Sequence, residues 1–296
     1  MTKGVLLMAY GTPARPDDVE AYYTDIRRGR APTAEQLADL RRRYDAIGGV
    51  SPLRQRTEAQ AAALADALGT EWPLVALGMK HASPSIEAGV TALVEQGATS
   101  AVGLVLAPLY SALSTGEYIE RAGKAAGEHG LEVTFVESWH LAPGYVDLLA
   151  ARVGEGLGRL PRGSHLVVTA HSLPSRIVDA GDPYPAQLHA MAAAIAARGG
   201  VADGQWRAAW QSAGRTAEPW LGPDIVAVIG ELAEAGAPGV LVAPAGFVSD
   251  HLEVLYDLDI DAARVGREHG IAFARTRMPN DDPAFIDTLA EIVRGA

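Results

Sequence analysis

Eight short apolar runs alternate with segments of helical periodicity along the whole chain. The apolar runs cover residues 4–9, 74–79, 101–107, 132–136, 165–170, 206–211, 239–243 and 271–275. The helical patterns cover residues 35–46, 56–68, 85–96, 117–129, 145–157, 185–198, 223–235 and 283–294. This alternation is typical of α/β proteins with mainly parallel sheets, helices on both faces and right-handed crossovers. We therefore predict an α/β fold in which the eight strands form two sheets of four.

The segment from Trp139 to Gly144 marks the expected crossover between two halves, because proline and glycine interrupt the periodicity there. We predict an N-terminal α/β domain at 1–140 and a C-terminal α/β domain at 141–279. The last helix, within 280–296, is expected to pack back onto the first domain.

Three strand ends share an aromatic or imidazole residue three positions before a proline. These residues are Tyr10, His81 and His171. This shared pattern is too short to establish an internal duplication. It does place polar side chains at the carboxyl ends of strands, where ligands bind in open α/β sheets.

The composition excludes several classes of function. A formal net charge of −11 argues against nucleic acid or an anionic membrane as the main partner. The chain has no cysteine, which excludes disulfides, a thiolate nucleophile and a cysteine-ligated iron–sulfur cluster. The apolar run 5–9 is too short for a signal-peptide core, and the stretch 101–113 is broken by Pro108. We expect a cytoplasmic protein without stable membrane insertion.

Three carboxylates follow the seventh apolar run at intervals of four residues: Glu253, Asp257 and Asp261. On a helix opening near Asp250 they would share one face, where like charges repel by roughly a few tenths of a kcal/mol per pair. A metal ion or a proton-transfer chain would offset this repulsion. Asp250 and Glu253 also fit a capping box, which leaves the later acids unexplained. A functional stripe and a solvated acidic face both remain open, and Asp259 lies off the stripe.

His171 and Tyr10 each close a predicted strand. A histidine titrates near neutrality and can serve as a base or a metal ligand, although a lone histidine can equally be a packed or capping residue. A tyrosine at such a place can pack under the following turn with its hydroxyl hydrogen-bonded, or it can ligate ferric iron as phenolate. The position at strand ends favours a functional role for His171 and leaves both interpretations of Tyr10 open.

Basic residues gather early in this acidic chain, at Arg27, Arg28 and Arg30 and again at 41–43. Lys80 follows the second predicted strand. Such residues are often a solvated face, but a local basic cluster could also hold the carboxylates of a ligand. The phosphate loop GxxxxGK[ST], a GxGxxG turn after a strand, HExxH and GxSxG are all absent from the sequence.

Eight segments together resemble those of ferrochelatases, in particular the soluble bacterial type that inserts iron into coproporphyrin III. They occur in order along nearly the whole chain, which makes the combination far more specific than any one of them. The segments are MAYGTP (8–13), IRRGR (26–30), YDAIGGVSP (44–52), TAHSLP (169–174), GDPYP (181–185), WQS (210–212), PWLGP (219–223) and GFVSDHLEVLYD (246–257).

The resemblance implies two similar Rossmann-like, chelatase-type domains, each a four-stranded parallel sheet flanked by helices, with a porphyrin cleft between them. It implies that His171 and Glu253 face the macrocycle centre as the catalytic pair and bind the entering metal. Asp257 and Asp261 match positions that deliver metal or remove protons. Tyr10 matches an axial ligand to the product iron on the other macrocycle face.

The resemblance also implies a set of porphyrin contacts at the propionates or the cleft rim. Arg27, Arg28, Arg43, Tyr44 and Ser51 occupy matching positions, and Lys80 is compatible with the same role. Trp220 would line the cleft, or form a buried structural ring.

The implied activity is that of a lyase-class metal chelatase of haem biosynthesis. It inserts Fe(II) into coproporphyrin III to give coprohaem, releases two protons and changes no redox state. Alternatives are a protoporphyrin IX chelatase, a preference for another divalent metal, or a haem or porphyrin carrier without turnover. No cofactor is expected beyond Fe(II), and without cysteine the iron–sulfur cluster of some relatives cannot form in their manner. The resemblance implies a monomer, with possible transient contacts to neighbouring haem-pathway enzymes.

Overall fold

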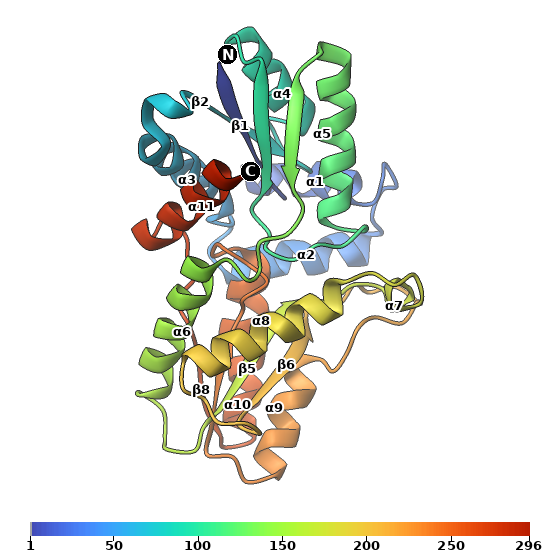
Figure 1. The fold of residues 1–296 in the computed structure, drawn as a ribbon. Helices are drawn as coiled ribbons and strands as arrows, with labels where there is room; N and C mark the ends of the chain where they lie inside the picture. The colour runs from blue at the N-terminus through green and yellow to red at the C-terminus, as the bar shows by residue number, and fades with distance from the viewer. Residues whose placement is uncertain (1) are drawn as a thin grey trace.

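Two four-stranded sheets, all parallel, form the centre of the computed structural model, which describes residues 2–296 (Figure 1). The strand order is β2-β1-β3-β4 in the first sheet and β6-β5-β7-β8 in the second. The predicted division into two sheets of four is therefore confirmed. The strands are β1 (Lys3–Ala9), β2 (Leu74–Met79), β3 (Ser100–Val105), β4 (Glu132–Val136), β5 (His165–His171), β6 (Trp206–Gln211), β7 (Gly239–Ala243) and β8 (Ala272–Arg275).

Helices cover both faces of each sheet, and each predicted helical pattern corresponds to one of them. The first half carries η1 (Pro16–Asp18), α1 (Val19–Ile26), α2 (Ala34–Ala46), α3 (Leu53–Leu68), η2 (Gly69–Glu71), α4 (Ile86–Glu95) and α5 (Thr115–His129). The second half carries α6 (Pro143–Leu157), α7 (Arg176–Asp179), α8 (Tyr184–Arg198), α9 (Ile225–Glu234), η3 (Val254–Ala262), α10 (Ala263–Glu268) and α11 (Pro283–Gly295). The short helices η1, α1, η2 and α7 did not have a recognisable sequence periodicity.

The two sheets share one topology. In each sheet the first strand lies between the second and the third. Successive connections therefore run to opposite sides of β1 in the first sheet and of β5 in the second. Such a reversal of strand order opens a crevice at the carboxyl ends of the strands. Tyr10 directly follows β1, and His171 is the last residue of β5, paired with Gln211 of β6. The two side chains therefore occupy equivalent places in the two sheets.

A single buried core extends across both sheets on one side. Side chains alternate along β1, so that Val5 and Leu7 enter this shared core while Leu6 and Met8 face a separate one under α4 and α5. In the second sheet Leu166 of β5 joins the shared core. Burial on both faces explains why these strands read as continuous apolar runs.

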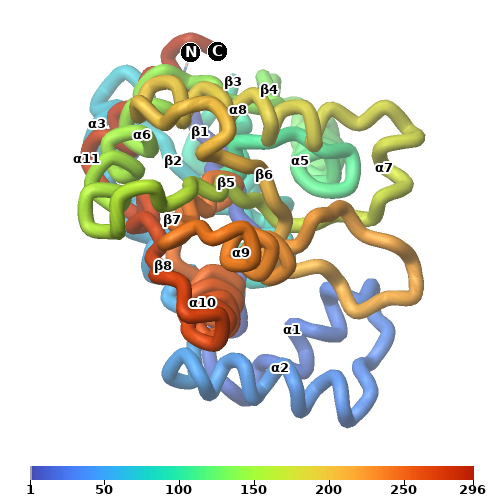
Figure 2. The backbone as a smooth tube through the Cα atoms, turned by 90° about the horizontal axis from the view of Figure 1, so that it is seen from below, coloured from blue at the N-terminus to red at the C-terminus, as the bar shows by residue number. Residues whose placement is uncertain are grey.

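The helices α3, α6 and α11 gather on one side of the two sheets, and α11 packs against both α3 and α6 (Figure 1 and Figure 2). Trp139, Tyr145 and Phe285 meet there, with ring centroids 4.9–6.0 Å apart. The Tyr145 hydroxyl donates to the carbonyl of Ala245 at 2.7 Å. The boundaries 1–140 and 141–279 stay a prediction. Within residues 2–296 no helix is long and apolar enough to cross a membrane.

We expect Phe285→Ala to destabilise the protein by about 3–5 kcal/mol, because the fully buried ring leaves a cavity among Trp139 and Tyr145. Leu141→Ala is the control, since Leu141 lies in the same region and is 49% exposed, and should change stability by less than about 0.5 kcal/mol. Guanidinium unfolding followed by tryptophan fluorescence measures both. Equal stability of the two variants would contradict the assignment of this core.

Candidate active site

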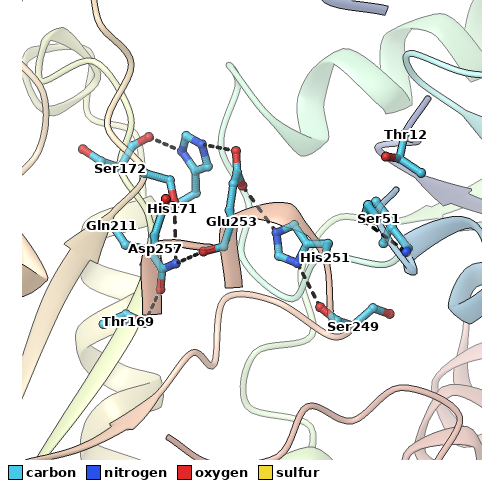
Figure 3. Close-up of polar contacts among 12 residues, drawn as sticks. Thr12, Ser51, Thr169, His171, Ser172, Gln211, Ser249, His251, Glu253 and Asp257 are labelled. Atoms are coloured by element: carbon cyan, nitrogen blue, oxygen red, sulfur yellow. Dashed lines mark hydrogen bonds and ion pairs between the residues drawn. The ribbon is translucent and has the colours of Figure 1, made fainter. Parts of the chain in front are cut away.

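An ion pair between His171 and Glu253 lies at the carboxyl edge of the second sheet (Figure 3). The imidazole Nε2 is 3.3 Å from Oε1 of Glu253. On the other side of the ring, Nδ1 contacts the carbonyl oxygen of Ser172, which fixes Nδ1 as a donor and turns Nε2 toward the carboxylate. The side chains of His171 and Glu253 remain 30% and 35% exposed. A ligand can therefore reach the pair that the sequence singled out.

His251 contacts the second carboxylate oxygen of Glu253, with Nε2 at 3.4 Å from Oε2. Its Nδ1 is 2.9 Å from the carbonyl oxygen of Ser249. The backbone of Glu253 is held too, because Nε2 of Gln211 donates to its carbonyl at 3.3 Å. Thr169 in turn donates to Oε1 of Gln211 at 2.7 Å, which fixes the amide (Figure 3).

The capping-box alternative for Asp250 and Glu253 is wrong. The carboxylate of Asp250 accepts from Nη2 of Arg275 at 3.0 Å and from Nδ2 of Asn280 at 2.8 Å. Glu253 directs its carboxylate at the two imidazoles, and its side chain makes no cap at the start of η3. The carboxylates of both acids are thus used in contacts with other side chains and not in capping the helix.

The charges of His171 and Glu253 stabilise each other. Burial alone would lower the pKa of His171, but the charge of Glu253 and its hydrogen bond outweigh burial and raise this pKa to about 9. Burial would likewise raise the pKa of Glu253, yet His171 and His251 together hold it well below its usual range. At neutral pH the pair is therefore an imidazolium and a carboxylate.

The helix that carries the acidic stripe is not the α-helix that the spacing suggested. Val254–Ala262 forms a π-helix, a rare form in which hydrogen bonds close five residues apart and which often lies at functional sites. Asp257 accepts a hydrogen bond from Ser212 and lies 3.6 Å from Nη1 of Arg43. Burial, and then the charge of Glu253, raise the pKa of Asp257 to about 6.

The other two acids of this helix differ in their surroundings. Asp261 is half-buried and lies within the electrostatic reach of Arg42 and Arg264. Asp259, which the sequence left unexplained, forms a bidentate pair with Arg275 at 2.6 and 2.9 Å. Within the stripe, the charge of Glu253 acts on Asp257, whereas Asp259, off the stripe, holds the helix through Arg275.

Tyr10 is not packed under the turn that follows it. Its side chain keeps 42% exposure, and its ring meets the ring of His81 edge-on at 4.7 Å. Nδ1 of His81 is in turn 2.7 Å from Oδ2 of Asp25. Enclosure by surrounding protein, followed by the charges of Glu253 and Glu117, raises the pKa of Tyr10 well above its usual value. The charge of Glu253, in the second half of the chain, thus acts on Tyr10 in the first half.

Three of the basic residues expected at the porphyrin rim, Arg28, Arg43 and Lys80, are already paired with acids. Arg28 donates to Glu117 at 3.0 Å, and the ammonium of Lys80 meets the other oxygen of the same carboxylate. Arg43 lies 3.2 Å from Asp39 in addition to its contact with Asp257. The guanidinium of Arg27 lies over the Tyr23 ring at 5.6 Å. Arg28 and Lys80 share Glu117, and Arg43 contacts Asp39 and Asp257, so these three cations are divided between two groups of carboxylates.

Tyr44 and Ser51 are buried, and both use their hydroxyl groups within the protein. The Tyr44 hydroxyl is 3.3 Å from Oγ1 of Thr12, and burial raises its pKa to about 12. Ser51 Oγ accepts from the backbone of Leu53 at 3.2 Å, which supports the start of α3. Trp220 is half-buried, donates to Thr216 at 2.8 Å and lies with its ring centroid 6.5 Å from that of His171.

Sequence reasoning missed two residues that shape this region, His251 and Glu117. His251 lies only two positions before Glu253, so a local contact between the two side chains could have been considered. Glu117 carries no such signal, since its partners lie far away along the chain. Among the residues described, no group of three or more His, Asp or Glu side chains is arranged to hold a metal ion by itself.

We expect the His171 imidazole to titrate well above pH 6.5 in the metal-free protein, because the Glu253 carboxylate stabilises its charged form. Glu253→Gln removes that charge and should return the pKa toward or below the ordinary value. Two-dimensional NMR of the histidine side chains across pH 5 to 10 measures both, with His189 on the exposed face of α8 as an internal reference. An unchanged His171 titration in Glu253→Gln would contradict the coupling.

Solved structures share this fold at low sequence identity. The sirohydrochlorin chelatase SirB of Bacillus subtilis subspecies spizizenii, in complex with cobalt, matches with a TM-score of 0.63 at 13% identity, over 99% of this chain and 94% of that one. CbiX, the terminal enzyme of sirohaem biosynthesis in denitrifying bacteria, matches with a TM-score of 0.57 at 17% identity, over 99% of both chains. The architecture is therefore the two-domain chelatase fold.

Sequence comparison assigns the family. The ferrochelatase family model matches residues 2–296. A coproporphyrin III ferrochelatase of Geobacillus kaustophilus is 46% identical, over 99% of this chain and 95% of its own length. One of Bacillus subtilis strain 168 is 45% identical over 98% and 96%, and a ferrochelatase of Herpetosiphon aurantiacus is 43% identical over 98% of both. The chain belongs to the ferrochelatase family.

Proposed function

We propose that this protein inserts Fe(II) into coproporphyrin III, giving coprohaem and two protons. The observation that carries the proposal is the His171–Glu253 pair, which remains accessible at the carboxyl edge of the second sheet. The relatives at 45–46% identity that bear the name coproporphyrin III ferrochelatase support the choice of substrate.

Proton removal is the chemical demand of the reaction, because the two pyrrole N–H groups must be deprotonated as the metal enters. Glu253, held ionised by two imidazoles, is the first acceptor. Asp257, whose pKa of about 6 lies near neutrality, can take up and release a proton in turn. Asp261, four residues further along the π-helix, would complete the route toward solvent. The same carboxylates attract the entering cation.

His171 has two tasks in this scheme. In the resting protein it is an imidazolium that keeps Glu253 ionised. An approaching Fe(II) lowers the pKa of the ring, so that Nε2 releases its proton to solvent and becomes free as a ligand. The ring therefore changes from a proton carrier to a metal ligand when iron arrives. The carbonyl of Ser172 holds Nδ1, which keeps Nε2 directed outward. The ring takes up a proton again once the iron has moved into the macrocycle, so the net release stays at the two pyrrole protons.

The remaining contacts would hold the macrocycle. The ring of Trp220, beside His171, offers an apolar surface to the porphyrin face. Arg27, Arg28, Arg43 and Lys80 supply positive charge for propionates. Ser51 uses its oxygen as an acceptor, so its hydroxyl hydrogen stays available to donate to a propionate.

Glu253→Gln should lower the rate of iron insertion by about 100-fold or more, because it keeps the shape of the side chain but removes the proton acceptor. The assay adds Fe(II) anaerobically to the protein with coproporphyrin III and follows the absorbance change. We expect four-propionate coproporphyrin III to be turned over faster than two-propionate protoporphyrin IX.

His171→Ala should be similarly impaired, whereas His189→Ala removes an exposed imidazole from α8 and should act like the wild type. A wild-type rate no faster than that of His171→Ala would leave porphyrin binding without catalysis, which is the behaviour of a carrier. A preference for protoporphyrin IX would overturn the substrate assignment and leave the chelatase reaction in place.

Tyr10→Phe should shift the absorption spectrum of the iron product complex. The phenol is protonated in the resting protein because its pKa is raised. Once dioxygen in air has oxidised the product iron to the ferric state, that iron supplies the positive charge that favours the phenolate. Tyr110→Phe is the matched control, because it also removes one phenol hydroxyl. Tyr110 lies in the segment before α5, whereas Tyr10 directly follows β1. Identical spectra of the Tyr10→Phe and wild-type product complexes would argue against ligation by Tyr10.

A further inference from the structure

Glu117 lies between two cations, with one carboxylate oxygen directed to each. Oε1 is 3.0 Å from Nη2 of Arg28, and Oε2 is 2.5 Å from Nζ of Lys80. The three residues come from separate elements: the turn after α1, the segment after β2 and the first turn of α5. Arg28 adopts a left-handed backbone conformation, with φ of 55°, in presenting its side chain to this cluster.

This cluster is adjacent to Tyr10. The backbone N–H of Lys80 donates to the carbonyl of Ala9, and that of His81 donates to the carbonyl of Tyr10, both at 2.9 Å. The His81 ring also packs against the Tyr10 ring at 4.7 Å. Lys80 and Glu117 are therefore fixed beside the face on which the porphyrin is proposed to bind.

The two cations differ in exposure. The Lys80 side chain is 9% exposed and its Nζ lies 5.1 Å from the centre of the Tyr118 ring, whereas the Arg28 side chain is 81% exposed. A nearly buried ammonium that loses its carboxylate partner is strongly destabilised. Without Glu117, Lys80 would therefore favour any carboxylate that a ligand could bring to the same place.

We propose that Glu117 competes with a porphyrin propionate for Lys80 and Arg28, and so limits affinity for the porphyrin. The inference rests on the proposed function. A propionate has the same charge and planar carboxylate as Glu117, so binding at these cations exchanges one carboxylate for another. When the porphyrin leaves, Glu117 again pairs with Lys80, so release does not leave an isolated buried charge.

Glu117→Gln tests the competition. We expect the Kd of coproporphyrin III, measured by fluorescence without iron, to fall about tenfold, the size of one charge-assisted hydrogen bond. KM should fall in parallel while kcat does not rise. In a Lys80→Met background the same substitution should have a smaller effect, because only the exposed Arg28 remains for the two carboxylates to compete for.

Glu268→Gln is the control for net charge, since it also removes one carboxylate, from the end of α10 where it pairs with Arg264. Its Kd should match that of the wild type. Glu117→Ser repeats the test with a small side chain if the glutamine variant is unstable, and thermal unfolding by circular dichroism verifies both folds.

Binding by Glu117→Gln that is equal to or weaker than wild type would overturn the inference, because Glu117 would then only hold the two cations in place. An equally large effect in the Lys80→Met background would overturn it as well. A wild-type protein that neither binds coproporphyrin III nor inserts iron would instead remove the proposed function.

Discussion

Parallel pairing within both sheets is the constraint on which the site depends. It brings the carboxyl ends of the strands in each sheet to one edge, and the reversal of strand order opens that edge beside β1 and β5. Tyr10 and His171 occupy those two places, so the repeated topology supplies a reactive side chain from each half. Because β7 is the neighbour of β5, the chain that leaves β7 returns past His171 and places Glu253 against it.

The π-helix is held by both of its faces. Val254, Leu258 and Ala262, four residues apart, are fully buried in the core of the second half. The opposite side is fixed by charge, with Asp257 bound by Ser212 and Arg43, and Asp259 bound by Arg275. A helical form that is otherwise rare persists because tertiary contacts outweigh its poorer local geometry. The same contacts leave Glu253 free of any capping role.

The apolar runs were sufficient to predict the sheets, because burial on both faces gives strands such as β5 a continuous hydrophobic sequence. The helix after β7 was predicted, but not its π form, since acids and apolar residues spaced by four are compatible with both forms. The ion pairs could not be predicted from the sequence, for a different reason. Glu117 is 89 residues from Arg28, and no local pattern links them. The capping-box alternative at Asp250 failed because distant Arg275 and Asn280 determine its orientation.

The arrangement of charge explains how an acidic chain can receive an anionic macrocycle and a cation together. Arg28 and Lys80 share Glu117, and Arg43 lies between Asp39 and Asp257, so the cations are stabilised before any ligand arrives. Under the proposed competition, propionates bind to Arg28, Lys80 and Arg43 by replacing or sharing an existing carboxylate, which moderates their affinity. Glu253 has imidazoles as its partners instead, and imidazoles can give up their protons when a metal approaches. The rim is therefore suited to reversible exchange of carboxylates, and the centre to exchange of protons for iron.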